Sequence, residues 1–254
     1  MPQFYTSTFK VSEKRIDSLV DMYCKKCPLC NGARVIENTT GIHKCSCLIK
    51  YKKAYELFNA NLPKEYHKFT KDDFVPEWQK KNEISLSRAM QYSIQLSKAL
   101  KEGFGLYIAG PAQSGKTFIA TLLLKRALHE GYSAYFIIFR EFINLALTAL
   151  RDKELAKDLN LLLTEIDFLV FADVDKVPVV KNQDIVNSIL PALLKKRTHA
   201  GKVNIITASK PLNELEDIIG FDLASLLTTS VAPIKLEGSA ILRKNSSLED
   251  KFFN

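Results

Sequence analysis

Short apolar runs alternate with segments of helical periodicity from residue 84 onward. Runs rich in Ile, Val, Phe and Tyr predict buried strands at 104–110, 132–139, 167–174 and 202–209, with one more strand inside 230–245. Apolar residues at helical spacing predict helices at 84–103, 117–131, 140–152, 153–166 and 182–201. Because strands and helices alternate, we expect an α/β fold with a mostly parallel sheet.

The pattern before residue 84 is different and indicates a smaller module. Apolar positions in 48–62 follow one helical face and predict a short helix that ends near Asn61. Residues 63–83 mix charges, two prolines and isolated aromatic residues, which is typical of an ordered linker. A chain of 254 residues can bury one sizeable core beside a small module. We therefore predict an N-terminal module at 1–60, a linker at 61–80 and a main domain at 81–254.

The charge of the chain is concentrated in its first part. Of the formal net charge of +8, residues 1–102 contribute +7, with 18 Lys and Arg against 11 Asp and Glu. This balance suits nucleic acid or an acidic partner, although a solvated surface would also produce it. The chain has no uninterrupted run of 18 apolar residues, and its N-terminus lacks the apolar core of a signal peptide. We therefore expect a cytoplasmic protein without membrane contact.

All five cysteines lie in one short stretch, "CKKCPLCNGARVIENTTGIHKCSC", between Cys24 and Cys47. Disulfides are rare in a reducing compartment, whereas paired thiolates at the ends of a short hairpin suit a tetrahedral zinc ion. The spacing predicts a zinc ribbon, in which Cys24 or His43 could replace one of the ligands. The predicted ligands are Cys27, Cys30, Cys45 and Cys47.

The segment "GPAQSGKT" fits the phosphate-binding pattern G-x-x-x-x-G-K-[ST] and lies between a predicted strand and a predicted helix. Gly110 and Gly115 would let the backbone approach the phosphates, and Lys116 would reach the β- and γ-phosphates of ATP. The hydroxyl of Thr117 would hold Mg²⁺. The predicted nucleotide-binding residues are Gly110, Pro111, Ala112, Gln113, Ser114, Gly115, Lys116, Thr117 and Phe118.

The strand "FLVFADVDKV" ends in two acidic residues, Asp173 and Asp175. In proteins that hydrolyse nucleotides, such a strand end supplies the carboxylates that hold magnesium and activate water. Because residues two apart on an extended chain face the same side, both carboxylates could lie near the metal. In the alternative interpretation, the two residues only cap the strand and solvate the loop after it.

The order and spacing of the motifs resemble the bacterial helicase loaders of the DnaC and DnaI type, which are AAA+ ATPases related to IstB-type transposition ATPases. Besides the motifs above, the resemblance depends on "NANLPKEYHKFTKDDF", "LLKKRTHAGKVNIITASKPLNEL" and "LEGSAILR", and it covers nearly the whole chain. It implies a P-loop NTPase core of the AAA+ type that binds ATP and single-stranded DNA and is able to self-associate. It also implies that the zinc module binds a hexameric replicative helicase.

The resemblance assigns roles to several further positions. Ser209 falls at the end of the sensor 1 strand, where asparagine is usual, and Arg243 falls near the sensor 2 arginine that would contact the γ-phosphate. Leu226 occupies the position at which relatives carry an arginine finger. The arginine is therefore missing there, and Arg197 could substitute for it.

The acidic strand departs from the family pattern. The magnesium-anchoring aspartate of the family falls at Ala172 and the water-activating acid at Asp173, or, displaced by one residue, at Asp173 and Val174. One acid is missing in either alignment. Loss of a catalytic base or an arginine finger typically removes several orders of magnitude in rate. We therefore expect ATP binding with weak or absent hydrolysis, in which Lys116, Asp173 and Asp175 are the candidate catalytic residues.

Two functions from different classes follow from this sequence. The first is an ATP-regulated loader that places a ring helicase on single-stranded DNA in DNA replication. The second is a non-hydrolysing adaptor, or an IstB-like transposition partner, that acts by binding alone. The zinc module favours the loader, and the incomplete set of acids favours the adaptor.

Overall fold

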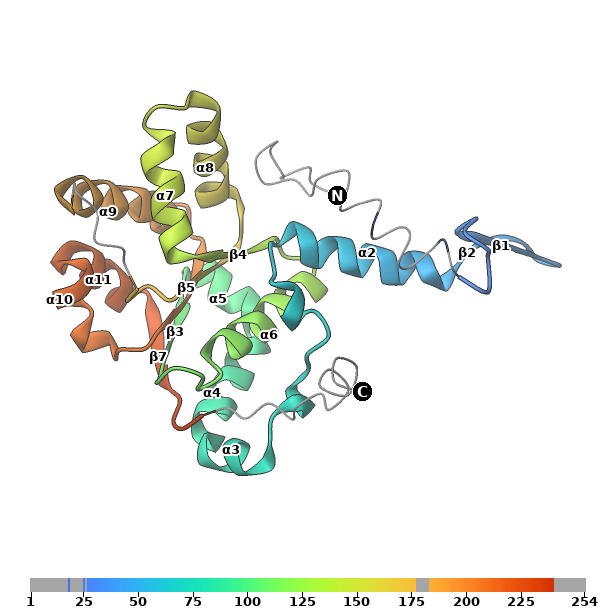
Figure 1. The fold of residues 1–254 in the computed structure, drawn as a ribbon, viewed down its shortest axis with the longest axis horizontal. Coiled ribbons are helices and arrows are strands. Elements are labelled where there is room, and N and C mark those ends of the chain that lie inside the picture. Colours follow the sequence, from blue (N-terminus) through green and yellow to red (C-terminus); the bar gives the residue numbers. More distant parts are fainter. Residues whose placement is uncertain (1–17, 19–24, 26, 177–182, 240–254) are drawn as a thin grey trace, which may run out of the picture. The chain divides into compact units, whose positions relative to one another are not determined.

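The computed structural model of the protein describes residues 18, 25, 27–176 and 183–239, without the side chains of 183–187 and 227–228. Within this part the chain forms two compact units, and the boundary between them falls between His67 and Lys68 (Figure 1). This boundary lies inside the stretch 61–80 that the sequence marks as a linker.

The first unit contains a hairpin followed by a helix. Strands β1 (Val35–Asn38) and β2 (Gly41–Lys44) pair antiparallel, with Val35 opposite Lys44. Helix α2 (Ser46–Asn59) begins directly after the hairpin and ends close to the predicted position. A 3-10 turn, η2 (Lys64–Tyr66), lies near the end of the unit. Because α2 starts earlier than expected, its first turn includes Cys47.

The second unit is built around a five-stranded sheet in the order β4-β5-β6-β3-β7. All neighbouring strands pair parallel, which confirms the predicted sheet. The three central strands are fully buried, as expected for apolar runs covered on both faces. The strands are β3 (Gly105–Ala109), β4 (Ala134–Ile138), β5 (Phe168–Ala172), β6 (Val203–Ala208) and β7 (Val231–Lys235).

Helices cover both faces of this sheet. Helix α6 (Lys116–His129) packs on strands β3 to β6 and on α4 (Glu83–Ser93). Figure 1 shows these two helices on one side and α9, α10 and α11 on the other. Among the described helices, none combines the length and the apolar character that crossing a bilayer requires. The described helices that follow β4 are α7 (Phe139–Ala149), α8 (Lys153–Glu165), α9 (Gln183–His199), α10 (Glu216–Ile219) and α11 (Phe221–Thr229).

The order of the strands fixes where a ligand is expected. The chain leaves β3 through α6 toward β4 at one edge, and it leaves β6 through α10 and α11 toward β7 at the other edge. Ligands of such sheets bind at the carboxyl ends of the strands where the direction of winding changes. In this protein that place is the carboxyl end of β3.

The predicted helix at 84–103 is interrupted. Helix α4 ends at Ser93, and a separate helix, α5 (Leu96–Glu102), follows and ends at Gly103 as expected, in the left-handed conformation. The break lies at Gln95, whose dihedral angles (φ −116°, ψ 27°) leave the helical region. Sequence periodicity could not reveal it, because buried residues continue at helical spacing on both sides.

The predicted linker supplies aromatic residues to the core of the second unit. Residues 68–82 contain η3 (Lys71–Asp73) and α3 (Pro76–Lys81). Phe74 and Trp78 are buried and stack with ring centroids 4.2 Å apart, and Phe74 contacts Phe118 of α6 at 4.3 Å. Isolated aromatic residues between charges carry no periodic signal, so the sequence did not indicate that this stretch packs on α6.

Arg197, the possible substitute for the arginine finger, is not available for that role. Its side chain is fully buried in the second unit and donates a hydrogen bond to Asn204 Oδ1. Burial lowers the pKa of Arg197 to about 9. Its other hydrogen bonds go to the carbonyl oxygens of Leu163, Ile166, Asp167 and Val203. The guanidinium therefore joins α8 and the starts of β5 and β6.

Replacing Arg197 by methionine should lower the free energy of unfolding by about 3–5 kcal/mol, because buried carbonyl groups lose their partners. Urea denaturation monitored by circular dichroism measures the change. Lys196→Met, at an exposed position of the same helix, is the control and should be nearly neutral. Equal stability of the two variants would contradict this role for Arg197.

Candidate functional site

The predicted phosphate-binding loop connects β3 to α6, in the strand–loop–helix context that the motif requires. The Gly110 N–H group donates to Ala208 O at 3.2 Å, which continues the pairing of β3 with β6. Gly115 has φ +89° and precedes the first residue of α6. The first backbone N–H groups of α6, which have no partner within the helix, therefore lie beside the loop, which is the arrangement that binds anions.

Gly110 has no room for a side chain. A Cβ atom at this position would lie 2.6 Å from Leu236 O and 2.6 Å from Ser114 Oγ. Ser114 is itself buried, and its Oγ has no hydrogen-bond partner among the described residues. An unsatisfied hydroxyl beside the start of a helix fits a loop that binds phosphate oxygens.

Lys116 closes over the loop in this structure. Its Nζ donates to Gly110 O at 2.8 Å and to Pro111 O at 2.7 Å. Burial lowers the pKa of Lys116, while the charges of Asp173 and Asp175 act in the opposite direction. The ammonium group is thus already at the loop, near both carboxylates, and it would have to leave the two carbonyl groups to reach a phosphate.

The acidic strand turns sharply where it reaches the site. Strand β5 ends at the buried Ala172, and Asp173 has φ +57°, in the left-handed region. The Asp173 N–H group donates to Thr207 Oγ1 at 3.0 Å, and its carboxylate accepts from Lys176 Nζ at 2.8 Å. Asp173 is therefore held by β6 and paired with a lysine.

Asp175 approaches the site for a different reason from the one predicted. Because Asp173 is not extended, the rule that residues two apart face the same side does not apply here. Asp175 Oδ2 instead accepts from the Ser209 N–H group at 2.9 Å, while its Oδ1 is buried without a hydrogen-bond partner among the described residues. One oxygen of Asp175 thus caps the end of β6, and the other is unsatisfied.

Of the other positions that the resemblance names, Ser209 contacts this cluster, Leu226 lies in α11, and Arg243 falls outside the described residues. Ser209 follows β6, as expected for sensor 1, and contributes its backbone N–H group. Leu226 is a half-buried residue of α11. The predicted sensor 2 residue, Arg243, and the alternative zinc ligand Cys24 fall outside the part of the chain that the structure describes.

Sequence reasoning missed two residues of this site. Thr207 Oγ1 accepts from the backbone of Asp173, and Lys176 pairs with the carboxylate of Asp173. The sequence offered only a weak signal for Thr207, which lies in the strand end "TAS". It offered none for Lys176, because its partner depends on the left-handed turn at Asp173.

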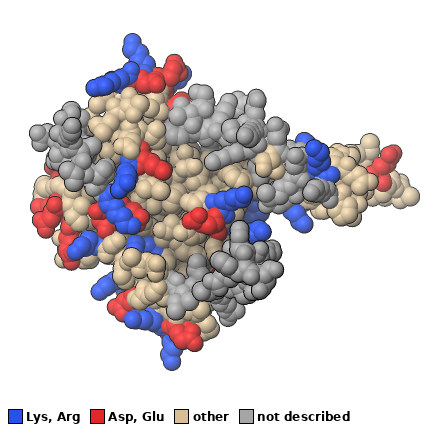
Figure 2. Space-filling model, in the orientation of Figure 1, with Lys and Arg blue, Asp and Glu red and all other residues tan. Residues whose placement is uncertain are grey.

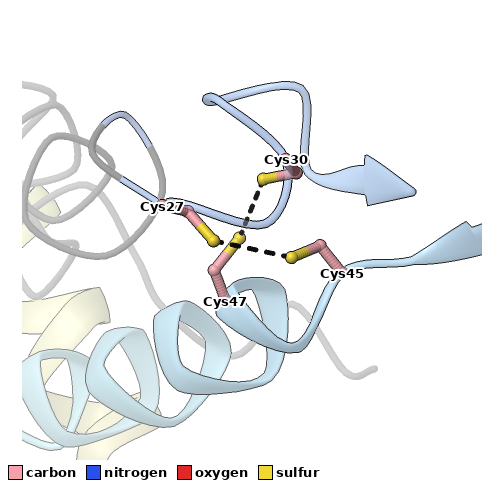
Figure 3. Close-up of side chains that lie close together, drawn as sticks. All are labelled: Cys27, Cys30, Cys45 and Cys47. Atoms are coloured by element: carbon pink, nitrogen blue, oxygen red, sulfur yellow. Dashed lines mark hydrogen bonds between the residues drawn. The ribbon is translucent and has the colours of Figure 1, made fainter.

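Four cysteine sulfurs gather in the first unit, and Figure 3 shows them pointing toward one another. All four Sγ atoms lie within 4.8 Å of one another, with 3.7 Å between Cys27 and Cys45 and 3.6 Å between Cys30 and Cys47. A tetrahedron with zinc–sulfur bonds of about 2.3 Å has edges of about 3.8 Å. The spacing of the sulfurs therefore fits a tetrahedral zinc ion, and it is far too long for disulfides.

The local backbone shapes this cluster. The Asn31 N–H group donates to Cys27 O at 2.9 Å, and Asn31 and Gly32 both have positive φ, so the chain turns tightly after Cys30. Hydrogen bonds from the backbone at Leu29, and then at Cys30, lower the pKa of Cys27 to about 7. Such bonds favour the thiolate, the form that binds metal.

His43, the alternative ligand, is not part of the cluster that the structure brings together. It lies on the exposed strand β2, and its Nε2 is 2.8 Å from Thr40 Oγ1. Among the described residues, the group that could hold a metal consists of Cys27, Cys30, Cys45 and Cys47.

Comparison with known proteins identifies the main domain. Residues 96–232 match the family profile described as IstB-like ATP binding protein. No curated protein matches the sequence.

Several solved structures share the fold. The crystal structure of the DnaC helicase loader is similar with a TM-score of 0.53 and 19% identity, over 68% of this chain and 99% of that chain. The crystal structure of DnaI is similar with a TM-score of 0.57 and 15% identity, over 69% of this chain and 94% of that chain. The replication initiator DnaA bound to AMPPCP and single-stranded DNA is similar with a TM-score of 0.53 and 15% identity, over 67% of this chain and 53% of that chain. At these identities the likeness concerns the fold, and it confirms the predicted P-loop NTPase class.

The full-length protein should purify with one zinc ion per chain. Cys30→Ser or Cys47→Ser removes one of four thiolates and should reduce the bound zinc well below one equivalent, because each ligand contributes to a single tetrahedral site. Emission spectrometry of the purified protein measures the metal. His43→Ala is the control and should retain all of it. Zinc-free wild-type protein, or loss of zinc in the histidine variant, would contradict the proposed ligand set.

Proposed function

The chain belongs to the family of IstB-like ATP-binding proteins, and we propose that it is an ATP-binding helicase loader. In this proposal the second unit binds ATP, and the first unit recruits a hexameric replicative helicase that is placed on single-stranded DNA. The observation that carries the proposal is the loop between β3 and α6, where Lys116 and the start of α6 meet beside the acidic residues that follow β5. The fold that the second unit shares with the DnaC helicase loader supports the role in loading.

Different groups of the loop would bind different parts of the nucleotide. The backbone N–H groups of the loop and of the first turn of α6 would bind phosphate oxygens, and the unsatisfied Ser114 hydroxyl would add a donor. Lys116 would exchange the carbonyls of Gly110 and Pro111 for the β- and γ-phosphates. Thr117 lies next in α6 and would hold Mg²⁺, which neutralises phosphate charge when bound.

The acidic side of the site supports binding better than hydrolysis. Ala172 provides no carboxylate at the end of β5, and Asp173 is paired with Lys176. Asp175 retains one unsatisfied oxygen but is committed through the other to Ser209. The carboxylates of Asp173 and Asp175 can contribute to a magnesium site. Ala172, however, provides no second acid beside Asp173 at the end of β5. We therefore propose that ATP acts mainly as a switch that is held rather than consumed.

The first unit has the features of a protein-binding module. Among its described residues, four large apolar side chains are exposed: Leu29 before the hairpin (63%), Val35 and Ile42 in the hairpin (43% and 71%) and Ile49 in α2 (70%). Large exposed apolar side chains suit a protein partner better than a phosphate backbone. A cysteine-bound zinc ion would hold this small surface in shape, because the hairpin has only four residue pairs.

Contact with DNA would involve basic side chains on either unit. Lys52 and Lys53 of α2 are exposed, and Figure 2 shows basic side chains along this part of the chain. On the visible face of the second unit, basic and acidic side chains are interspersed. The DnaA structure with the same fold contains single-stranded DNA, which supports DNA as a ligand of this fold.

A second candidate is a transposition ATPase or adaptor of the IstB type. The observation in its favour is the extent of the family match, which covers residues 96–232 and does not include the cysteine cluster. A protein of this kind would bind ATP through the same loop but would not recruit a replicative helicase.

Phosphate release should be slow. We expect a turnover below about 0.001 s⁻¹, the range of a P-loop enzyme that lacks an arginine finger, with or without single-stranded DNA. A continuous phosphate assay on the zinc-replete protein measures this rate, and Lys116→Ala supplies the background. A DNA-stimulated turnover of about 1 s⁻¹ or more would contradict the proposal that ATP is bound without being hydrolysed, because such a rate requires a complete set of catalytic residues.

The immobilised full-length protein should retain the hexameric replicative helicase of its own cell. Ile42→Asp should weaken this capture at least about tenfold, because a charge would enter an apolar contact. The control is Ile84→Asp, which makes the same change at a similarly exposed position of α4 (74% exposed) and should retain capture. Surface plasmon resonance measures both variants. Absence of helicase binding by the zinc-loaded wild type would favour the transposition function.

A further inference from the structure

A buried asparagine connects the start of α4 to the segment that follows β7. Asn82 lies between α3 and α4 and is only 3% exposed. Its Oδ1 accepts from the Glu237 N–H group at 2.8 Å, and its Nδ2 donates to Glu237 O at 3.1 Å and to Trp78 O at 3.0 Å. One side-chain amide thus satisfies both backbone groups of Glu237, as a neighbouring strand would.

The segment held in this way is the direct continuation of β7. Leu236 N–H donates to Ala109 O at 2.7 Å, so the pairing with β3 extends one residue beyond Lys235. On the other side, Ser85 Oγ donates to Lys235 O. Residues 235–237 are therefore fixed between the last residue of β3 and the start of α4.

This segment forms one wall of the phosphate-binding loop. The Leu236 carbonyl oxygen faces Gly110 so closely that a Cβ atom there would lie 2.6 Å from it. The other groups of Gly110 are also held, its N–H by Ala208 O and its carbonyl oxygen by Lys116 Nζ. The position of Leu236 therefore limits where the first residue of the loop can lie.

We propose that Asn82 is a positioning residue for the nucleotide site. It holds Glu237, and through it Leu236, against Gly110, so that the loop keeps the shape that receives phosphates. Without the amide, the two backbone groups of Glu237 lose their partners. The segment after β7 is then held only through Lys235 and Leu236, and its position against the loop is less well fixed. The inference rests on the proposed binding of ATP, and it places a determinant of that binding outside the loop motif.

The test compares two buried asparagines by nucleotide affinity and by stability. Asn82→Ala should weaken ATP binding by about tenfold or more, the effect of losing two modest hydrogen bonds that shape the loop. The control is Asn204→Ala, which removes a buried asparagine (5% exposed) that accepts from Arg197 at the amino-terminal end of β6, away from the loop. It should lower the midpoint of urea denaturation and leave ATP affinity unchanged.

A second variant keeps the shape of the side chain. Asn82→Asp retains an acceptor for the Glu237 N–H group but places a carboxylate against the carbonyls of Glu237 and Trp78. It should also weaken ATP binding by about tenfold, and it remains informative if the alanine variant does not fold. Isothermal calorimetry measures affinity at a temperature at which each variant is folded.

Two outcomes would overturn the inference. The first is wild-type affinity for ATP in a folded Asn82 variant. The second is a loss of affinity in Asn204→Ala that equals the loss in Asn82→Ala, because affinity would then follow stability alone. A wild-type protein that fails to bind ATP would instead contradict the proposed function, so the two failures are distinguishable.

Discussion

The candidate nucleotide site depends on the hydrogen bonds made by the end of β6. This strand lies between β3 and β5, and its last residues contact the segments that leave both neighbours. Ala208 accepts from Gly110 at the start of the loop, Thr207 accepts from Asp173 and Val174 through its side chain and backbone, and Ser209 donates to Asp175. A parallel sheet brings the carboxyl ends of its strands to one edge, and β6 fixes the loop and the acids there relative to each other.

The phosphate-binding loop and the acidic residues after β5 differ in how completely they are equipped for ATP hydrolysis. The loop side has the features of an anion site: a glycine without room for a side chain, the start of a long helix, a buried lysine and an unsatisfied hydroxyl. On the acid side, the strand stops at an alanine, turns through a left-handed aspartate and pairs that aspartate with Lys176. Electrostatics near the phosphates can therefore be favourable while the groups that would activate water are incomplete.

Much of this architecture was predictable from the sequence because it depends on local patterns. Apolar runs gave the five strands, and the glycines and Lys116 gave the position of the loop. The spacing of Cys27, Cys30, Cys45 and Cys47 predicted the group of sulfurs that the structure brings together. In each case the signal lies within a few residues and reflects a backbone or ligand geometry that few residue types satisfy.

The features that could not be predicted depend on contacts between residues distant in sequence. Asn82 and Glu237 are 155 residues apart, and nothing near either indicates that they pair. Phe74 and Trp78 lie in the predicted linker, yet they stack on each other, and Phe74 packs on Phe118 of α6. Arg197 resembled a free basic residue, yet it is buried among carbonyl groups. The left-handed turn at Asp173 was not predictable either, and its positive φ determines which groups Asp173 and Asp175 contact.

The central claim is that the loop at 110–118 binds the phosphates of ATP. Calorimetric titration of the full-length, zinc-replete protein with ATP and Mg²⁺ tests it most directly, beside Lys116→Ala and the exposed control Lys101→Ala. The account predicts one ATP per chain for the wild type and for Lys101→Ala, and an affinity lower by about a hundredfold or more for Lys116→Ala, which loses a charged contact with two phosphates. No heat of binding with the folded wild-type protein, or equal affinity in all three proteins, would contradict it.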